Sequence, residues 1–111
     1  MEALRNQAGQ TLEEFLDSYD PRKWEQPCVT VDMAVVTEER EILLIRRGNH
    51  PNIGAWALPG GFLEMDETLY EGAARELWEE TGLRGVLLNP LGSYGEPTRD
   101  PRCRIVTTAF F

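Results

Sequence analysis

The sequence is poor in the residues that bind soft metals and form crosslinks. It contains two cysteines, Cys28 and Cys103, which lie far apart without a C-x-x-C spacing, and a single histidine, His50. Two distant cysteines predict neither a zinc site nor a disulfide framework, so we expect two ordinary free thiols. No neighbouring serine or cysteine suggests a hydrolytic triad with His50, which we interpret as a loop residue.

Positive charge and long apolar runs are also scarce. The chain of 111 residues has 11 Lys and Arg against 19 Asp and Glu, which gives a net charge of −8. A general nucleic-acid surface needs clustered basic residues, so this class of partner is not expected. No apolar run approaches the length of a membrane span, and the first ten residues lack the apolar centre of a signal peptide. We therefore expect one small cytoplasmic domain, without a membrane partner, whose anionic ligands would meet local basic groups.

The clearest local pattern predicts a helix over residues 68–81. Thr68 and Glu71 form a Thr-x-x-Glu capping box, which satisfies free backbone amides in the first turn. Gly82 follows the acidic end of the segment and suits a left-handed C-terminal cap.

Three carboxylates follow one another on this helix. Glu79 and Glu80 lie three and four positions after Glu76, the spacing that places side chains on a shared face. Carboxylates so close repel one another unless a cation lies between them, and oxygen ligands suit a hard ion such as Mg²⁺ or Mn²⁺. Mg²⁺ commonly completes its shell with substrate phosphate oxygens, which points to a phosphate substrate. The alternative is a solvated acidic face, in which Arg75 pairs with Glu71 or Glu79 and orients a carboxylate.

Several segments have the composition of β-strands. Strands are predicted over residues 29–36 and 41–46, joined by a hairpin connection at 38–40, and further candidates span 86–88, 91–94 and 104–111. The segment 58–61 is too rich in glycine and proline to continue a strand or a helix, but its backbone can approach the carboxylates closely. One helix set against such a sheet predicts an α/β or α+β fold.

The N-terminal part of the chain has a separate pattern. A second Thr-x-x-Glu capping box at Thr11 predicts a short helix that ends near Ser18. Polar residues and prolines follow it, which is typical of a linker. We therefore divide the chain into an N-terminal helix and linker, 1–27, and a catalytic domain, 28–111.

Glycines, carboxylates and an arginine recur at fixed offsets that resemble the Nudix box. Gly61 is followed after five residues by Glu67, and after seven more by the run from Arg75 to Leu83, RELWEETGL, without departure from the family pattern. Nine constrained positions at fixed spacing form a specific signal. The segment from Trp56 to Gly61 is also similar to the sequence that leads into Nudix boxes.

The resemblance implies a mixed β-sheet between helices and hydrolysis of a nucleoside diphosphate linked to another moiety. Carried over by position, the implied metal ligands are Glu76, Glu79, Glu80 and the Gly60 carbonyl, and the implied catalytic residues are Glu76 and Glu79. Structural or orienting roles are implied for Gly61, Glu67, Arg75 and Gly82. Bound Mg²⁺ or Mn²⁺ would neutralise charge on the phosphate oxygens and lower the pKa of a water molecule.

Candidate substrate contacts lie outside the box in two arginine pairs. Arg46 and Arg47 end a predicted strand, while Arg99 and Arg102 lie in a turn-rich loop. Guanidinium groups suit pyrophosphate oxygens, although both pairs are also consistent with solvated positions. The loop, with Pro97 before it, resembles that of Nudix domains that take ADP-ribose or related ligands. An ADP-ribose-like substrate is therefore favoured.

The end of the chain raises a further expectation. Nudix domains normally continue beyond the strand that ends here at Phe111, so we expect the domain to be incomplete at its C-terminus. A strand ending in two phenylalanines would leave apolar side chains and a sheet edge in need of cover. A homodimer that completes the sheet is one expectation.

Three other interpretations stay open at this point. A Nudix module can sense ADP-ribose-type ligands without turnover, or it can act on nucleoside triphosphates. The last interpretation is a structural domain with a solvated acidic face, which the full box makes a poor fit.

Overall fold

A mixed four-stranded sheet forms the centre of the structure, a computed structural model that describes residues 3–111. Its strands are β1 (Cys28–Met33), β4 (Gly60–Phe62), β5 (Pro90–Tyr94) and β6 (Ile105–Phe110), in the spatial order β4-β1-β6-β5. Strands β1 and β6 run parallel, and the two outer strands are antiparallel to their neighbours. The predicted α+β class with a mixed sheet is confirmed.

Strand β6 lies inside the sheet rather than at its edge. It pairs with β1 over six residues on one side and with β5 on the other. The expectation of an unpaired edge at this strand is therefore wrong, because the segment 90–94 supplies the missing partner. Ala109 and Phe110 are buried, whereas Phe111 is 54% exposed, so only the last apolar side chain lacks cover as expected.

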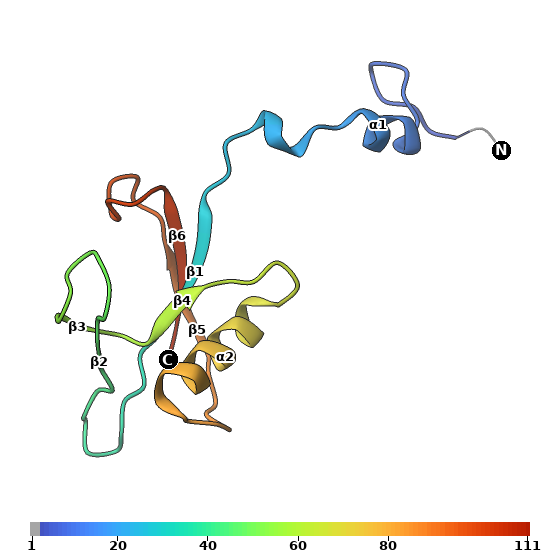
Figure 1. Cartoon of the computed structure of the whole chain (residues 1–111). Coiled ribbons are helices and arrows are strands. Elements are labelled where there is room, and N and C mark those ends of the chain that lie inside the picture. The colour runs from blue at the N-terminus through green and yellow to red at the C-terminus, as the bar shows by residue number, and fades with distance from the viewer. Residues whose placement is uncertain (1–2) are drawn as a thin grey trace.

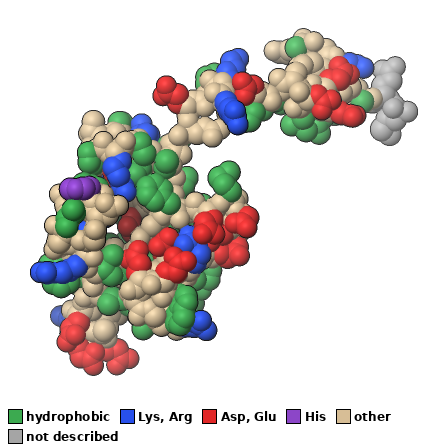
Figure 2. Space-filling view, in the orientation of Figure 1, with side chains coloured by type: hydrophobic (Ala, Val, Ile, Leu, Met, Phe, Trp, Pro, Cys, Tyr) green, Lys and Arg blue, Asp and Glu red, His purple; other side chains and the backbone are tan. Residues whose placement is uncertain are grey.

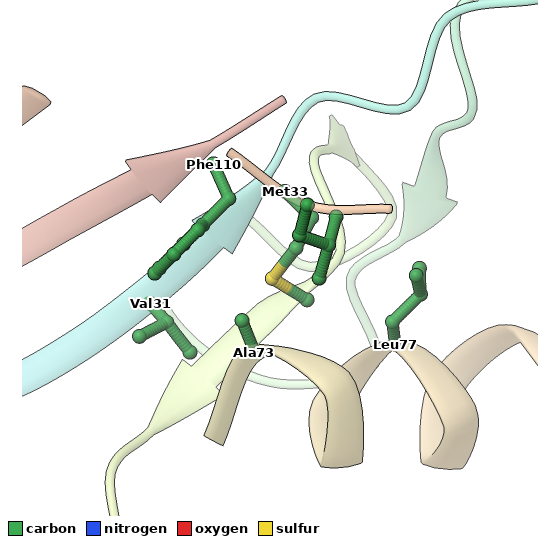
Figure 3. Close-up of a cluster of buried hydrophobic side chains, with 6 residues drawn as sticks. Val31, Met33, Ala73, Leu77 and Phe110 are labelled. Carbon is green, nitrogen blue, oxygen red and sulfur yellow. The ribbon is translucent and has the colours of Figure 1, made fainter. Parts of the chain in front are cut away.

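Helix α2 (Leu69–Thr81) packs against one face of the sheet (Figure 1). Alternate residues of β1 face the helix, and Val31 and Met33 meet Ala73 and Leu77 there, with Phe110 from β6 completing the contact (Figure 3). Leu88 joins this core from the segment after the helix.

Both predicted ends of this helix are confirmed. Thr68 and Glu71 form the capping box in both directions, and Gly82 adopts the left-handed conformation with φ of 75°. The caps fix where α2 begins and ends, and therefore which of its side chains reach the sheet.

The N-terminal residues form an arm that extends away from the sheet (Figure 1). It carries the predicted short helix, α1 (Leu12–Ser18), and a 3₁₀ turn, η1 (Pro21–Lys23), and neither has a buried residue. The radius of gyration is 19.1 Å, against about 13 Å for a compact chain of this length. Among the described residues, no helix has the length and apolar character needed to cross a membrane.

Three predictions about the sheet need correction, and the strand expected over 29–36 also ends early, at Met33. The segment 41–46 forms only the two-residue strand β2 (Ile45–Arg46), which pairs with β3 (Trp56–Ala57), because both sides of β1 are already occupied. The hairpin connection itself is present, closed by a bridge between Val36 and Ile42. The segment 86–88 is not a strand, since it is extended and buries Leu88 without pairing.

The glycine-rich segment provides the third correction. Residues 58–61 were expected to interrupt regular structure, yet Gly60 and Gly61 pair with β1 as part of β4. A Cβ at Gly60 would collide with the Val31 carbonyl, so only glycine allows this close pairing.

Candidate active site

A cavity of about 680 Å³ opens on the sheet face opposite the core. Alternation along β1 places Thr30 and Asp32 on that face, while Val31 and Met33 point to the helix. The other walls come from the β2–β3 hairpin, the loop before β6, and two carboxylates of α2, Glu76 and Glu80. The volume falls in the usual range for small-molecule sites.

Arg75, in the middle of α2, organises carboxylates of the helix and of the loop before it. Its Nε and Nη2 donate to the two carboxylate oxygens of Glu67 at 3.0 and 2.7 Å, and its Nη1 donates to Glu76 at 2.9 Å and to Glu79 at 3.1 Å. Nη2 also donates to the Phe62 carbonyl of β4 at 3.0 Å. These contacts hold the helix, its preceding loop and strand β4 in one arrangement. Acidic side chains gather with a basic one over the start of α2 and the loop before it (Figure 2).

The partners of Arg75 differ in part from the expected ones. Glu79 is a partner, but Glu71 is not, because its carboxylate accepts from the Thr68 amide in the capping box. Glu67 accepts from Arg75 and from the Glu64 amide at 2.8 Å, and these hydrogen bonds lower its pKa. Glu67 therefore stays ionised and fixes the loop before α2.

Gly61 leaves room for the carboxylate of Glu76. A Cβ built at this glycine would lie 2.5 Å from the Glu76 carboxylate carbon, so any side chain there must displace that group. The Glu76 side chain is only 13% exposed and is held by Arg75. The glycine thus brings a helix carboxylate next to the edge strand of the sheet.

Gly61→Ala is expected to reduce activity at this site while leaving the fold intact. The methyl group meets the end of a flexible side chain rather than backbone, so Glu76 moves and the sheet does not. We expect at least about a tenfold loss of turnover, with Tm changed by no more than about 2 °C. Gly92→Ala in β5 is the matched control, because its Cβ would make ordinary contacts. Equal activity for the two variants would contradict the role of Gly61.

Glu80 lies beside Glu76 in an electrostatically unfavourable position. Although the residue is exposed as a whole, partial desolvation of its carboxyl group raises its pKa to about 7. The neighbouring carboxylates of Glu76 and Asp32 raise this pKa further, while a weak hydrogen bond from the Gly60 amide, at 3.4 Å, opposes the shift. Among the described residues Glu80 therefore has no ion pair of its own, whereas the neighbouring Glu76 is paired with Arg75.

The raised pKa of Glu80 predicts a pH-dependent stability of the metal-free protein. The folded state binds this proton more tightly than the unfolded state, so its contribution is full below about pH 4.5 and is lost as pH rises through about 7. After allowance for solvent screening, the loss is on the order of 1 kcal/mol, or roughly 4 °C in Tm. Thermal melts with chelator at pH 5 and pH 8 should show this difference in wild type but not in Glu80→Gln. The same pH difference in both proteins would exclude the assignment.

A hard divalent cation fits this pair of carboxylates. Glu76 and Glu80 supply oxygen ligands on the cavity wall, and a cation would relieve the repulsion that raises the pKa of Glu80. Within residues 3–111, however, no three His, Cys, Asp or Glu side chains converge to hold an ion by themselves. The remaining ligands would have to come from water and from a bound phosphate, which is the usual pattern for Mg²⁺.

Glu79 and Gly60 are placed differently from the predicted ligand set. Glu79 is half-exposed, is held by Arg75 and does not line the cavity. Gly60 lines the cavity, but its amide is the group that faces Glu80. The helical spacing grouped the three glutamates, and Arg75 Nη1 contacts both Glu76 and Glu79, but only Glu76 and Glu80 line the cavity.

All four predicted arginines line the same cavity. Arg46 lies over the Trp56 ring at 4.7 Å, and Arg47 is engaged with the backbone of its own loop through the carbonyls of His50 and Pro51. Arg102 forms a two-pronged ion pair with Asp100, with distances of 3.0 and 2.8 Å.

Asp100 and Arg99 complete the wall of the cavity that carries the arginines. The ion pair with Arg102 lowers the pKa of Asp100 to about 2 and raises that of Arg102. In the described part of the chain, the guanidinium groups of Arg99 and Arg46 have no hydrogen-bond partner, and Arg46 lies over the Trp56 ring, so Arg99 has the fewest contacts of the four.

Sequence reasoning missed two acidic residues of the cavity. Asp32 accepts a hydrogen bond from Thr107 at 2.6 Å and lies near Glu80, and Asp100 anchors Arg102. Asp32 is the one charged residue in the strand CVTVDM, and a charge within an otherwise apolar strand was a signal that could have identified it.

Comparison with known proteins agrees with the fold and the box. The NUDIX domain family matches residues 26–111, and the chain therefore belongs to the NUDIX family. Members of this family generally use divalent metal ions. A crystal structure of the NUDIX domain of Shewanella oneidensis NrtR with ADP-ribose has a TM-score of 0.81 and 34% identity, over 91% of this chain and 69% of that one.

Two curated relatives differ from each other in what they do. An ADP-ribose pyrophosphatase of Methanocaldococcus jannaschii is 44% identical over 80% of this chain and 52% of its own length. The ADPR responsive transcriptional repressor NtrR of Acinetobacter baylyi is 42% identical over 87% of this chain and 41% of its own length. This chain thus spans about half or less of the relatives it matches.

Proposed function

We propose that this chain forms the catalytic domain of a Nudix pyrophosphohydrolase that cleaves a nucleoside diphosphate linked to another moiety, with an ADP-ribose-like substrate favoured. One observation carries the proposal. The two box carboxylates, Glu76 and Glu80, and the basic residues outside the box line one cavity. A pyrophosphate needs both groups, because its oxygens bind a cation on one side and guanidinium groups on the other.

The charges in the cavity are arranged for such a ligand. The carboxylates of Asp32, Glu76 and Glu80 form an acidic end near strand β4, and the arginines come from the hairpin and from the loop before β6. A phosphate held by Arg99 would present its remaining oxygens to the acidic end. The chain has a net charge of −8, so this local basic wall is what would offset repulsion of an anion.

A divalent ion, Mg²⁺ or Mn²⁺, would be held by Glu76 and Glu80 and would supply charge neutralisation at the scissile phosphate and a more acidic bound water. The chain's own residues provide positioning. Arg75 keeps Glu76 in place, Gly61 leaves room for that carboxylate, and the Gly60 amide steadies Glu80. Glu79 is half-exposed. We therefore favour Glu76 or a further residue, rather than Glu79, as the general base.

The substrate class draws support from the relatives. An archaeal relative is an ADP-ribose pyrophosphatase, and a bacterial NUDIX domain with a similar fold was crystallised with ADP-ribose. A cavity of about 680 Å³ is large enough for a nucleotide of this size. Nucleoside triphosphates are the less favoured alternative.

A second candidate function is ligand sensing without turnover. It is favoured by the similarity to a repressor that responds to ADPR. Glu76, Glu80 and the complete box favour the enzyme, because sensing alone places no demand on paired metal-ligand carboxylates.

A hydrolysis screen tests the proposal. The purified chain would be assayed with Mg²⁺ and with Mn²⁺ against ADP-ribose, NADH, nucleotide sugars and nucleoside triphosphates, with AMP and pyrophosphate release as the readout. We expect metal-dependent AMP release, highest with ADP-ribose and abolished by chelator. Saturable ADP-ribose binding without release of AMP from any compound would favour the sensor.

We also propose that the chain associates as a homodimer; because β6 already has a partner on each side, the contact expected at this strand is replaced by one through the N-terminal arm. Leu12, Phe15 and Leu16 follow the spacing of one helix face, yet no residue of α1 is buried within its own chain. A second copy would cover this face. Native mass spectrometry should give twice the chain mass of 12.6 kDa, and Leu16→Glu should restore the monomer. A monomeric mass for the wild type at micromolar concentration would exclude the dimer.

A further inference from the structure

The two cysteines of the chain meet in space. The Cys103 Sγ lies 3.8 Å from the Cys28 Sγ, although the residues are 75 positions apart in sequence, and both residues are exposed. Cys28 begins β1, and Cys103 ends the loop that leads into β6 at the same end of the sheet (Figure 1). The sequence predicted two ordinary thiols, and both are free in this structure.

The backbone around the two thiols is fixed. The Cys28 amide donates to the Arg104 carbonyl at 2.9 Å, and Cys28 is in register with Ile105, which is buried. The side chains therefore start from positions that the sheet itself defines. The two sulfur atoms must approach from 3.8 Å to about 2.05 Å to form a disulfide.

We propose that Cys28 and Cys103 form a redox-active pair, whose oxidation to a disulfide fastens the 95–104 loop to the start of strand β1. That loop carries Arg99, Asp100 and Arg102, three of the residues that line the cavity. In the reduced form the end of this wall is held by the Cys28–Arg104 hydrogen bond and the sheet pairing, and oxidation would add a covalent link that restricts the loop further. Exposed thiols that lie next to a second thiol are the usual basis of such pairs, and exposed disulfides are the readily reduced ones.

The oxidant is a low-molecular-weight disulfide, and the exchange balances in two steps. The Cys28 thiolate attacks one sulfur of the reagent, which forms a mixed disulfide and releases one reagent thiolate. Cys103 then loses its proton, its thiolate attacks the Cys28 sulfur, and the second reagent thiolate leaves. Two protein thiols are oxidised and one reagent disulfide is reduced to two thiols. The S–H of Cys103 points to Cys28, and partial desolvation together with this hydrogen bond raises the pKa of Cys103.

The test titrates the full chain with mixtures of reduced and oxidised glutathione. Peptide mass mapping should show a Cys28–Cys103 crosslink that dithiothreitol reverses. The crosslink closes a long loop, so we expect Tm to rise by about 10 °C. Trypsin cleavage after Arg99 and Arg102 should slow by at least about fivefold, because the loop is held at its end.

Two single variants serve as controls. Cys28→Ser and Cys103→Ser keep one exposed thiol each and should give only a mixed disulfide with glutathione, with Tm and trypsin sensitivity close to the reduced wild type. Two results would overturn the proposal. The wild type could form only mixed or intermolecular disulfides, or the crosslinked protein could be cleaved after Arg99 and Arg102 as fast as the reduced protein.

Discussion

Glu80→Gln is expected to lower metal-dependent hydrolysis of ADP-ribose by about 10²-fold or more, without loss of fold. Glutamine keeps the size of the side chain but removes a charged oxygen ligand from the cavity wall next to Glu76. Because the carboxylate is destabilised in the metal-free protein, its removal should leave Tm unchanged or slightly higher at pH 8. Initial rates with Mg²⁺ and calorimetric titration of Mn²⁺ measure the two effects.

Two comparison variants make this result specific. Glu39→Gln changes an exposed glutamate in the hairpin turn and should behave as wild type. Glu79→Gln should lose less activity than Glu80→Gln, because Glu79 is turned to Arg75 and away from the cavity. Wild-type turnover in Glu80→Gln, or an equal loss in Glu39→Gln, would refute the ligand assignment.

Arg75→Ala is expected to damage both the fold and the activity. The change leaves Glu67, Glu76 and Glu79 without their shared cation and breaks the contact to the Phe62 carbonyl. Uncompensated carboxylates repel one another, so we expect Tm to fall by about 5 °C or more and turnover by about 10²-fold. Thermal melts and initial rates at saturating metal check these values.

The matched controls separate charge from geometry. Arg75→Lys keeps the charge but cannot donate two parallel hydrogen bonds to Glu67, so it should recover part of the stability and little of the activity. Arg84→Ala removes another arginine next to α2, one that lies over Trp78, and should have little effect on turnover. Full activity in Arg75→Ala would show that Glu76 needs no orientation by this arginine.

Local signals in the sequence were sufficient to predict helix α2. The capping box at Thr68 and the glycine cap at Gly82 act within a few residues, so the chain's own neighbours determine both ends of the helix. The same is true of α1 and its Thr11 cap. Strand β6 was also predicted in place, because its β-branched and aromatic residues suit a buried strand, and β5 was predicted nearly in place although most of its residues are exposed.

Contacts between distant segments were not predictable in the same way. The glycines of β4 were expected to interrupt regular structure. Their lack of a side chain is instead what permits pairing with β1 and the approach of Glu76. The segment 41–46 has strand composition and yet cannot join the sheet, because β1 already has two partners. Propensity describes a segment, whereas pairing depends on which partners are free.

In the candidate site too, residues close in sequence could be predicted and residues from distant segments could not. Glu76 and Glu80 could be identified from their spacing and from the resemblance to the Nudix box, since both lie on one helix. Asp32 and Asp100 come from a strand and a loop far away in sequence, and only the fold brings them to the cavity. The meeting of Cys28 with Cys103 follows from the parallel pairing of β1 and β6, which no local pattern encodes.

One measurement tests the central claim most directly. Wild type and Glu80→Gln are each incubated with ADP-ribose and Mg²⁺ at the same metal concentration and pH, and the products are separated and quantified. The account predicts equal amounts of AMP and ribose 5-phosphate from the wild type, no products with chelator, and at least about a 10²-fold lower rate for the variant. Saturable binding of ADP-ribose by both proteins, with no AMP from either, would contradict it and identify the chain as a ligand-binding module.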